Sequence, residues 1–300
     1  AETRAHALKA ADMVDIEYEI LEPILPIEDA IAKESYYTDE MIHMKNICGH
    51  SLNSGDVDSV FKNAKDDDNV KIITGSTRIG GQEHFYLEPN ACVVEVTDND
   101  EVLTISSTQT PMKHQAYIAD CLGFSRNKVN CKAKRLGGGF GGKESRSGFM
   151  NVAVAVAAYQ LRKPVSLVLD RDVDMQITGH RHPFRGDWKA AFDLTSKKII
   201  ALDVKLYNNA GNSLDLSASV LDRGLLHVDS AYNIPNLRAV GYCCKTNLPS
   251  NTAFRGFGGP QGIMIGEAVV DDVARSMNLA PDSVRENHLY NEGDTTHFGM

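Results

Sequence analysis

The sequence predicts a mixed α+β fold, and three observations lead to this prediction. Segments rich in β-branched residues recur along the chain, as is typical of strands, at 70–77, 91–97 and 102–107. Segments with a helical spacing of apolar residues follow them, at 111–122, 145–161 and 261–277. The composition, with 42% hydrophobic and 24% charged residues among 300, is ordinary for a globular protein.

The first 69 residues are predicted to contain two helices and one strand. Residues 3–13 have helical spacing, and the alternation of polar and apolar residues at 15–20 predicts a strand. A short helix is expected at 28–33, and the polar stretch 49–69 is interpreted as a loop. A domain boundary is expected near residue 34.

The remainder of the chain predicts strands and helices around two glycine-rich loops. A strand at 128–134 leads into the first loop, the helix at 145–161 follows it, and a buried strand is expected at 165–169. Residues 186–245 are predicted to be mostly strands. Two helices are expected after the second loop, at 261–277 and 281–290.

Charge, apolar run length and cysteine spacing exclude several classes of protein. The net charge of −9 argues against nucleic acid as a partner, because binding a phosphate backbone needs a basic face. The longest apolar stretch, residues 150–159, is too short to cross a bilayer, so no membrane partner is expected. The six cysteines form no C-x-x-C pair and are interpreted as reduced thiols of a cytosolic protein. This chain alone is therefore not expected to hold an iron–sulfur cluster or a zinc ribbon.

The two glycine-rich loops are the most informative local feature. They are GGGFGGKE at 137–144 and FRGFGGP at 254–260, and each sets a phenylalanine among glycines. Glycine admits positive φ and lets main-chain N–H groups approach a ligand closely. We therefore expect one bulky anionic ligand to be held from two sides.

The first loop also matches two nucleotide-binding patterns imperfectly. Its G-x-G-x-x-G spacing fits the dinucleotide fingerprint, but Asp170 follows the last glycine by 28 residues, where about 20 is expected. It nearly forms a phosphate loop, but Glu144 stands where Mg²⁺ binding requires Ser or Thr, and a carboxylate there repels phosphate. Nucleoside triphosphate binding is rejected, and a Rossmann-type NAD-binding dehydrogenase domain over 128–170 stays as an alternative.

Four short motifs in order carry a more specific signal. They are GGQEHFYLE at 80–88, STQ at 107–109, the first glycine loop, and NTAFRGFGGPQ at 251–261. Together they resemble the molybdenum hydroxylase family of xanthine dehydrogenases and aldehyde oxidases. The resemblance implies that residues 1–34 are the end of an α/β hammerhead domain and that residues 35–300 belong to the first molybdopterin-binding domain.

The resemblance also implies how the molybdenum cofactor is held. In the family a pterin dithiolene holds the metal, and no protein side chain bonds it directly. Gln109 matches the glutamine that donates an amide hydrogen bond to an oxygen on the metal. Phe140 and Gly141 match the loop whose backbone N–H faces the metal, a preorganised donor for an anionic ligand. Ala253 and Arg255 match positions beside the metal site.

Three further positions match substrate contacts in the family. Glu144 matches the carboxylate that hydrogen-bonds a purine, and Arg223 the arginine that stabilises negative charge on the heterocycle. Phe257 matches the ring that packs against a flat substrate. Aldehyde oxidases generally lack the Glu and Arg pair. The resemblance therefore implies a purine substrate, with oxidation of hypoxanthine to xanthine and of xanthine to urate, and an aldehyde oxidase is the alternative.

The base glutamate of the family has no match in this chain. Gly266-Glu267 lies within an apolar helical segment, so we expect the 300 residues to be an inactive fragment of a longer enzyme. The resemblance implies FAD and [2Fe-2S] clusters in other parts of that enzyme, with NAD or oxygen as the final electron acceptor. It also implies a homodimer in the cytoplasm, with the peroxisome as the alternative location. A non-catalytic relative of the family is a third possibility.

Overall fold

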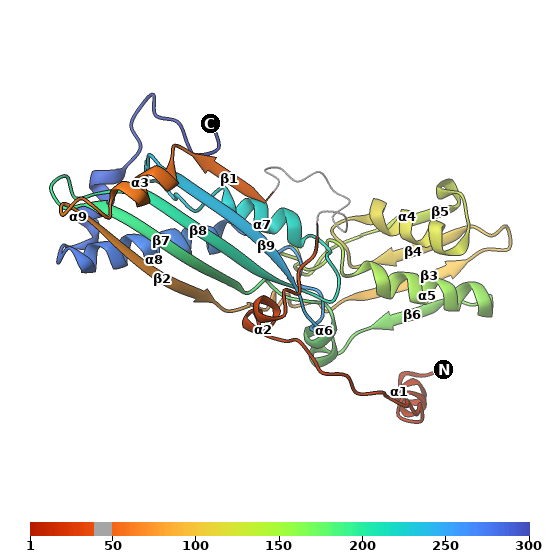
Figure 1. Cartoon of the computed structure of the whole chain (residues 1–300). Coiled ribbons are helices and arrows are strands. Elements are labelled where there is room, and N and C mark those ends of the chain that lie inside the picture. Colours follow the sequence, from red (N-terminus) through yellow and green to blue (C-terminus); the bar gives the residue numbers. More distant parts are fainter. Residues whose placement is uncertain (39–49) are drawn as a thin grey trace.

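The computed structural model describes residues 1–38 and 50–300, which form two halves, each built on one β-sheet (Figure 1). The strand order is β1-β9-β8-β7-β2 in the five-stranded sheet and β5-β4-β3-β6 in the four-stranded sheet. The strands are β1 Ser51–Ser54, β2 Val70–Ile79, β3 Ala91–Val96, β4 Val102–Ser106, β5 Val129–Lys132, β6 Val165–Val168, β7 Phe184–Asp193, β8 Lys198–Gly211 and β9 Leu237–Lys245. Both sheets carry helices, so the predicted mixed α+β class is confirmed.

The four-stranded sheet packs against helices α4 (Pro111–Leu122) and α5 (Gly148–Leu161). Helix α4 begins at a proline and ends before Gly123, which has φ of 69°, so both of its boundaries follow from the sequence. Strand β3 is antiparallel to both β4 and β6, and only the β4–β5 pair is parallel. This mixed sheet is not the parallel doubly wound sheet that a NAD-binding domain requires.

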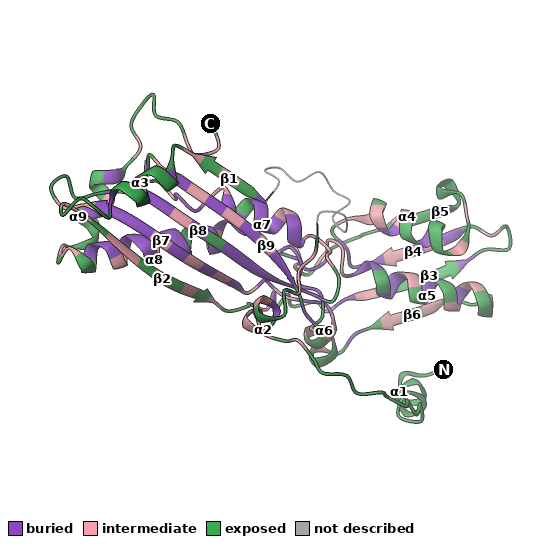
Figure 2. Cartoon of the chain, viewed as in Figure 1, coloured by how far each residue is buried: buried purple, intermediate pink, exposed green. Residues whose placement is uncertain are grey.

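The five-stranded sheet is covered on both faces. Helices α7 (Ser217–Leu225), α8 (Gly259–Ser276) and α9 (Pro281–His288) pack on one face and bury the largest apolar core of the described residues (Figure 2). Short helices α2 (Ile27–Ala32) and α3 (Val57–Asn63) form smaller apolar clusters on strand residues that alternate with that core. Among the described residues, no helix has the length and apolar character needed to cross a membrane.

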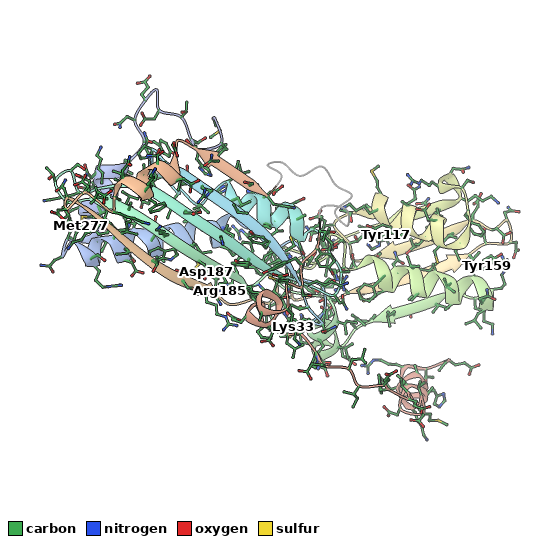
Figure 3. All side chains as sticks on the ribbon, in the orientation of Figure 1. Lys33, Tyr117, Tyr159, Arg185, Asp187 and Met277 are labelled. Atoms are coloured by element: carbon green, nitrogen blue, oxygen red, sulfur yellow. The ribbon has the colours of Figure 1, made fainter. Side chains whose placement is uncertain are left out.

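An ion-pair cluster joins α2 to the five-stranded sheet. Arg185 and Asp187 project side by side from β7 (Figure 3), and Arg185 Nε lies 2.8 Å from Asp187 Oδ1. Glu28 of α2 lies 3.5 Å from Arg185 and 3.0 Å from Arg78 of β2. These charges are partly exposed, so we assign them an orienting role and little stability.

The prediction of a loop over 49–69 is wrong for most of that range, of which residue 49 lies outside the described residues. Strand β1 adds to the edge of the sheet beside β9, and helix α3 follows it. The Asp56 side chain caps α3 by accepting the Ser59 N–H, and Val57 and Phe61, one turn apart, are buried. Cap and apolar spacing were both present in the sequence.

The predicted strand at 15–20 is absent, although helix α1 (Arg4–Ala11) forms as expected. The segment has no strand partner among the described residues, and its apolar side chains are exposed, 93% in the case of Ile20. Alternation specifies which face a strand would bury, but a strand forms only against a partner.

Two helices were not predicted from the sequence. One follows the predicted strand at 165–169, and the other lies within residues 186–245, which were predicted to be mostly strands. Helix α6 (Arg171–Ile177) begins directly after Asp170, whose carboxylate is paired with Arg4. Helix α7 lies within 186–245, and its buried Val220, Leu221 and Leu225 face the sheet. Both α6 and α7 lie toward the junction of the two halves (Figure 1).

Candidate functional site

The two glycine loops meet at the junction of the two halves. The first connects β5 to α5, and the second leads into α8. Arg255 N donates a hydrogen bond to Phe140 O at 2.9 Å, so the loops pair although they are more than a hundred residues apart in sequence. Gly141 packs directly against the Ala253 carbonyl group, where a Cβ atom would lie 2.7 Å from the carbonyl carbon. The two loops therefore contact each other directly, and the expectation that they hold one ligand between them stays a prediction.

The phenylalanine of each loop has a left-handed backbone. Phe140 has φ of 53° and Phe257 has φ of 51°, and each is followed by a glycine that also has positive φ. Such consecutive left-handed residues are uncommon and need support from their surroundings. The result is that Phe140 is about half exposed at the junction, whereas Phe257 packs against the core of the five-stranded sheet.

Gln109 lies at the exposed side of the first loop, just beyond the end of β4. Its side-chain Oε1 accepts hydrogen bonds from Gly141 N at 2.9 Å and from Lys143 N at 3.2 Å. Its backbone N–H donates to Lys143 O. Because the amide oxygen is occupied in this way, the amide NH2 group is the part of Gln109 left for a ligand. The Gly141 N–H, by contrast, is already donated to Gln109. The loop backbone at Phe140 and Gly141 was predicted to present an N–H to the metal, and this stays a prediction.

A buried lysine anchors the first loop from below. Lys143 Nζ donates to Glu88 O at 2.6 Å and to Ser107 Oγ at 2.7 Å, and it lies 3.1 Å from Glu88 Oε2. Burial lowers the pKa of Lys143, and Glu88 opposes this effect. Burial alone would raise the pKa of Glu88, but hydrogen bonds from Gly137 N, Ser107 and Lys143 lower it. Lys143 is therefore structural and does not reach a phosphate, as the rejection of a phosphate loop requires.

A second buried network, around His114 of α4, fixes the strand end that carries Gln109. His114 Nε2 lies 3.0 Å from Thr108 Oγ1 and 2.9 Å from Ser147 Oγ, while Asn151 Nδ2 donates to His114 Nδ1 at 2.9 Å. The ring is therefore neutral, with its proton on Nε2. Thr108 Oγ1 in turn donates to the Lys143 carbonyl, so the network reaches the first loop. No single sequence motif indicated this role for His114.

We expect acid to weaken the protein through His114. Burial lowers the pKa of His114 to about 4 from an ordinary value near 6.5. Since the unfolded chain binds the proton more readily, stability is full above about pH 6.5 and falls as the pH drops toward 4, by up to about 1.4 kcal/mol per pH unit. Heat-inactivation midpoints of the full-length enzyme between pH 7.5 and 4.5 should fall more steeply for the wild type than for His114→Gln. Parallel curves for the two proteins would contradict this expectation.

Glu144, at the end of the first loop, is half-buried. Its Oε1 lies 3.5 Å from Lys113 Nζ of α4, and its backbone is held by Gly141 and by the Thr110 hydroxyl. Side-chain hydrogen bonds then connect the next residue, Ser145, through Thr252 to Asp215. Asp215 lies two residues before the start of α7, the helix that carries Arg223.

Arg223 is an exposed residue of α7, and no hydrogen bond or ion pair joins its guanidinium to another described residue. Helix α7 packs tightly against the second glycine loop, since a Cβ on Gly258 would overlap the Val220 carbonyl oxygen and lie 3.2 Å from Gly224 N. Arg223 therefore lies one residue from that contact. Within residues 1–38 and 50–300, Glu144 and Arg223 do not touch each other directly.

Glu267 of α8 is held by structural partners. Its carboxylate accepts hydrogen bonds from Tyr232 OH at 2.7 Å and from Arg285 Nε at 2.9 Å. Burial would raise the pKa of Glu267, but these hydrogen bonds lower it. The interpretation that Gly266-Glu267 is not the base motif of the family stays a prediction.

The described residues hold no group of three or more His, Cys, Asp or Glu side chains that could bind a metal ion. The groups that the junction presents are instead the Gln109 amide, the exposed Arg255 and Arg223 side chains and the loop backbone. Such donors suit an anionic ligand that brings its own metal ligands.

Residues 40–289 match the family model described as the molybdopterin cofactor-binding domain. The chain is 49% identical over 299 residues to xanthine dehydrogenase 1 of Arabidopsis thaliana and 48% identical over 301 residues to xanthine dehydrogenase/oxidase of Felis catus. These matches include 99% and 100% of this chain. The chain spans only 21% of the length of each relative.

Solved structures agree with this assignment. The aldehyde oxidoreductase from Desulfovibrio gigas matches all of this chain, and 32% of its own, with a TM-score of 0.85 and 26% identity. A CO dehydrogenase from Oligotropha carboxidovorans shares the fold, with a TM-score of 0.81 at 20% identity over 99% of this chain and 39% of its own. On these matches the chain belongs to the molybdopterin cofactor-binding domain family, as the sequence motifs predicted.

Proposed function

We propose that this chain binds the molybdenum cofactor and a purine in an enzyme that oxidises hypoxanthine to xanthine and xanthine to urate. The observation that carries the proposal is a cation, Arg223, that has no ion-pair partner within residues 1–38 and 50–300 and lies on the helix that packs against one glycine loop, with a carboxylate, Glu144, at the end of the other. The similarity of nearly the whole chain to proteins named xanthine dehydrogenase supports it.

The residues at the junction fit a molybdopterin cofactor. The Gln109 NH2 group points away from its loop contacts and can donate to an oxygen of the cofactor. Arg255 offers an exposed cation two residues after Ala253. Its backbone N–H binds the carbonyl of Phe140, which is itself half exposed. The Gly141 N–H already donates to Gln109, so in our proposal Gly141 orients the glutamine and permits close approach of the loops. The bound cofactor would supply the two-electron oxidation chemistry.

The purine contacts follow from charge and shape. Glu144 would accept a hydrogen bond from a ring N–H, and its half-buried position strengthens that bond relative to one in water. Arg223 would stabilise the negative charge that builds up on the ring as the substrate is attacked. Phe257 would pack against the flat heterocycle from the second loop.

We also propose that the general base is not among these 300 residues, because Glu267 is held by Tyr232 and Arg285. The isolated chain should then not oxidise xanthine, even if it is loaded with cofactor. Turnover by the purified 300-residue chain would contradict this part of the proposal.

The proposal is tested on the full-length holoenzyme with xanthine and with benzaldehyde as competing substrate classes. We expect kcat/KM to be much larger for xanthine, because a purine can use both Glu144 and Arg223, whereas an aldehyde can use neither fully. A preference for benzaldehyde would favour the aldehyde oxidase alternative.

Several family expectations extend the proposal beyond the described residues. We propose the α/β hammerhead domain for residues 1–34 and the first molybdopterin-binding domain for 35–300, which includes the matched range 40–289. FAD, [2Fe-2S] clusters, the choice of NAD or oxygen as acceptor, homodimer formation and a cytoplasmic location rest on the family resemblance.

A further inference from the structure

Two side chains from outside the glycine loops hold the carbonyl groups of Ala253 and Arg255, the residues that flank Phe254. His84 lies between β2 and β3, and its Nε2 donates to Ala253 O at 2.8 Å. Arg181 Nη2 donates to Arg255 O at 2.9 Å. Each of these two carbonyl groups is thus bound by a different side chain, which fixes the orientation of the Ala253–Phe254 and Arg255–Gly256 peptide planes.

The same two side chains also contact the Phe254 ring. The His84 and Phe254 rings are stacked with their centroids 4.4 Å apart, and the Arg181 guanidinium carbon lies 3.9 Å from the Phe254 centroid. Stacking and cation–π contacts of this kind favour one ring position. Phe254 is therefore constrained at its backbone and at its side chain, and Arg255 is the next residue in the chain.

His84 reaches the first glycine loop as well. A Cβ on Gly142 would lie 2.8 Å from His84 Cγ, so the imidazole fills the space beneath that glycine. Burial lowers the pKa of His84, although its hydrogen bond to Ala253 opposes the change, so the neutral ring with its proton on Nε2 is favoured. One buried side chain, His84, thus contacts both loops.

Arg181 is itself held in place. Its Nε donates to Gln82 Oε1 at 2.6 Å, and its backbone forms β-bridges to Gln82 and to Thr252. Three distant segments, around residues 82, 181 and 252, therefore run side by side at this point. Because the Arg181 backbone is held by both neighbours, its guanidinium is well placed to bind the Arg255 carbonyl.

We propose that His84 and Arg181 are positioning residues that hold Phe254 and thereby set the position of Arg255 against the first glycine loop. They act through the loop, because the contacts described above are to its peptide groups and to Phe254. The inference rests on the proposed function in that Arg255 is taken to lie beside the cofactor.

The test uses four variants of the full-length holoenzyme. Arg181→Met removes the hydrogen bond to the Arg255 carbonyl, and Arg181→Lys keeps the charge. His84→Phe keeps a ring next to Phe254 but removes the donor to Ala253, and His84→Gln retains an N–H donor and loses the ring. The measurements are molybdenum content per protomer, the EPR spectrum of the Mo(V) form, kcat and KM for xanthine, and the heat-inactivation midpoint.

Two matched controls come from elsewhere in the fold. Arg162→Met removes a guanidinium at the end of α5 that also lies over an aromatic ring, that of Tyr159, and also makes a hydrogen bond, to the Asp100 carboxylate. His288→Gln removes a buried imidazole that binds the Val284 carbonyl in the five-stranded half. Each control has a contact of the same kind without a hydrogen bond to either glycine loop.

We expect Arg181→Met and His84→Phe to lower kcat per molybdenum by roughly 10–100-fold and to alter the Mo(V) spectrum, as loss of an outer-sphere partner does at metal sites. Arg181→Lys and His84→Gln should recover part of the loss, and the two controls should change only the inactivation midpoint. Normal spectra and normal kcat per molybdenum in Arg181→Met and His84→Phe would overturn the proposal.

If a strong variant fails to fold, its conservative partner decides the outcome in the same way: a changed spectrum supports the proposal and an unchanged one overturns it. The molybdenum content and the Mo(V) spectrum need no purine. Failure of the proposed substrate class would therefore appear as a preference for benzaldehyde by the wild type, whereas failure of this inference would appear in the spectra of the variants.

Discussion

Replacing Arg223 by methionine in the full-length enzyme is expected to lower kcat/KM for xanthine by roughly 10²–10³-fold, the usual effect of removing one preorganised group that stabilises developing charge. Oxidation of benzaldehyde should stay within a few-fold of the wild-type rate, because no heterocycle carries the charge. The structure makes the change informative, since Arg223 has no ion-pair partner among the described residues and its loss leaves no buried charge behind. Steady-state kinetics with both substrates measure the effect.

The matched control is Arg275→Met, which removes another exposed helical arginine, one that is paired with Asp272 on the far part of α8. Its kinetics should equal those of the wild type. Equal losses on xanthine and on benzaldehyde in Arg223→Met would mean that Arg223 supports the fold or the cofactor, and the purine role would then be lost.

Replacing Gly141 by alanine is expected to separate the two glycine loops. Gly141 has φ of 101°, and an added Cβ would overlap the Ala253 carbonyl group. Alanine disfavours this φ, and its Cβ would also clash with the backbone. We therefore expect the free energy of unfolding to fall by about 2–4 kcal/mol. The loop would have to shift, which breaks the Gly141 N–H bond to Gln109 and the pairing of Phe140 with Arg255. Molybdenum content and activity should fall together.

Two other glycines separate conformational strain from the clash. Gly123 has φ of 69° at the end of α4 with open space around its Cβ position, so Gly123→Ala has strain without overlap. Gly80 has open space as well and no positive φ. We expect molybdenum content to be normal in both variants and the inactivation midpoint to fall slightly in Gly123→Ala alone. A Gly141→Ala enzyme that retained full molybdenum would refute the close-packing argument.

Much of the fold could be predicted because its signals are local. Strands β2, β3 and β4 have β-branched runs, and α4 is bounded by Pro111 and Gly123, so each of these elements follows from its own residues. The same reasoning failed for residues 15–20, where pairing with a partner decides whether a strand forms. It also failed for α7, where burial against β8 and β9 outweighs a sequence that was interpreted as strand.

The candidate site divides in a similar way. By itself the sequence determined the family, through motifs around Gln109, the two glycine loops and Arg255, and the residue types that suit an anionic cofactor. Only the tertiary structure showed that Lys143 is buried beneath its loop, that the Gly141 N–H is bound by Gln109, and that His84 contacts both loops. The physical reason is that a residue's type is set by one position, whereas burial and hydrogen-bond partners depend on segments that folding brings together from across the chain.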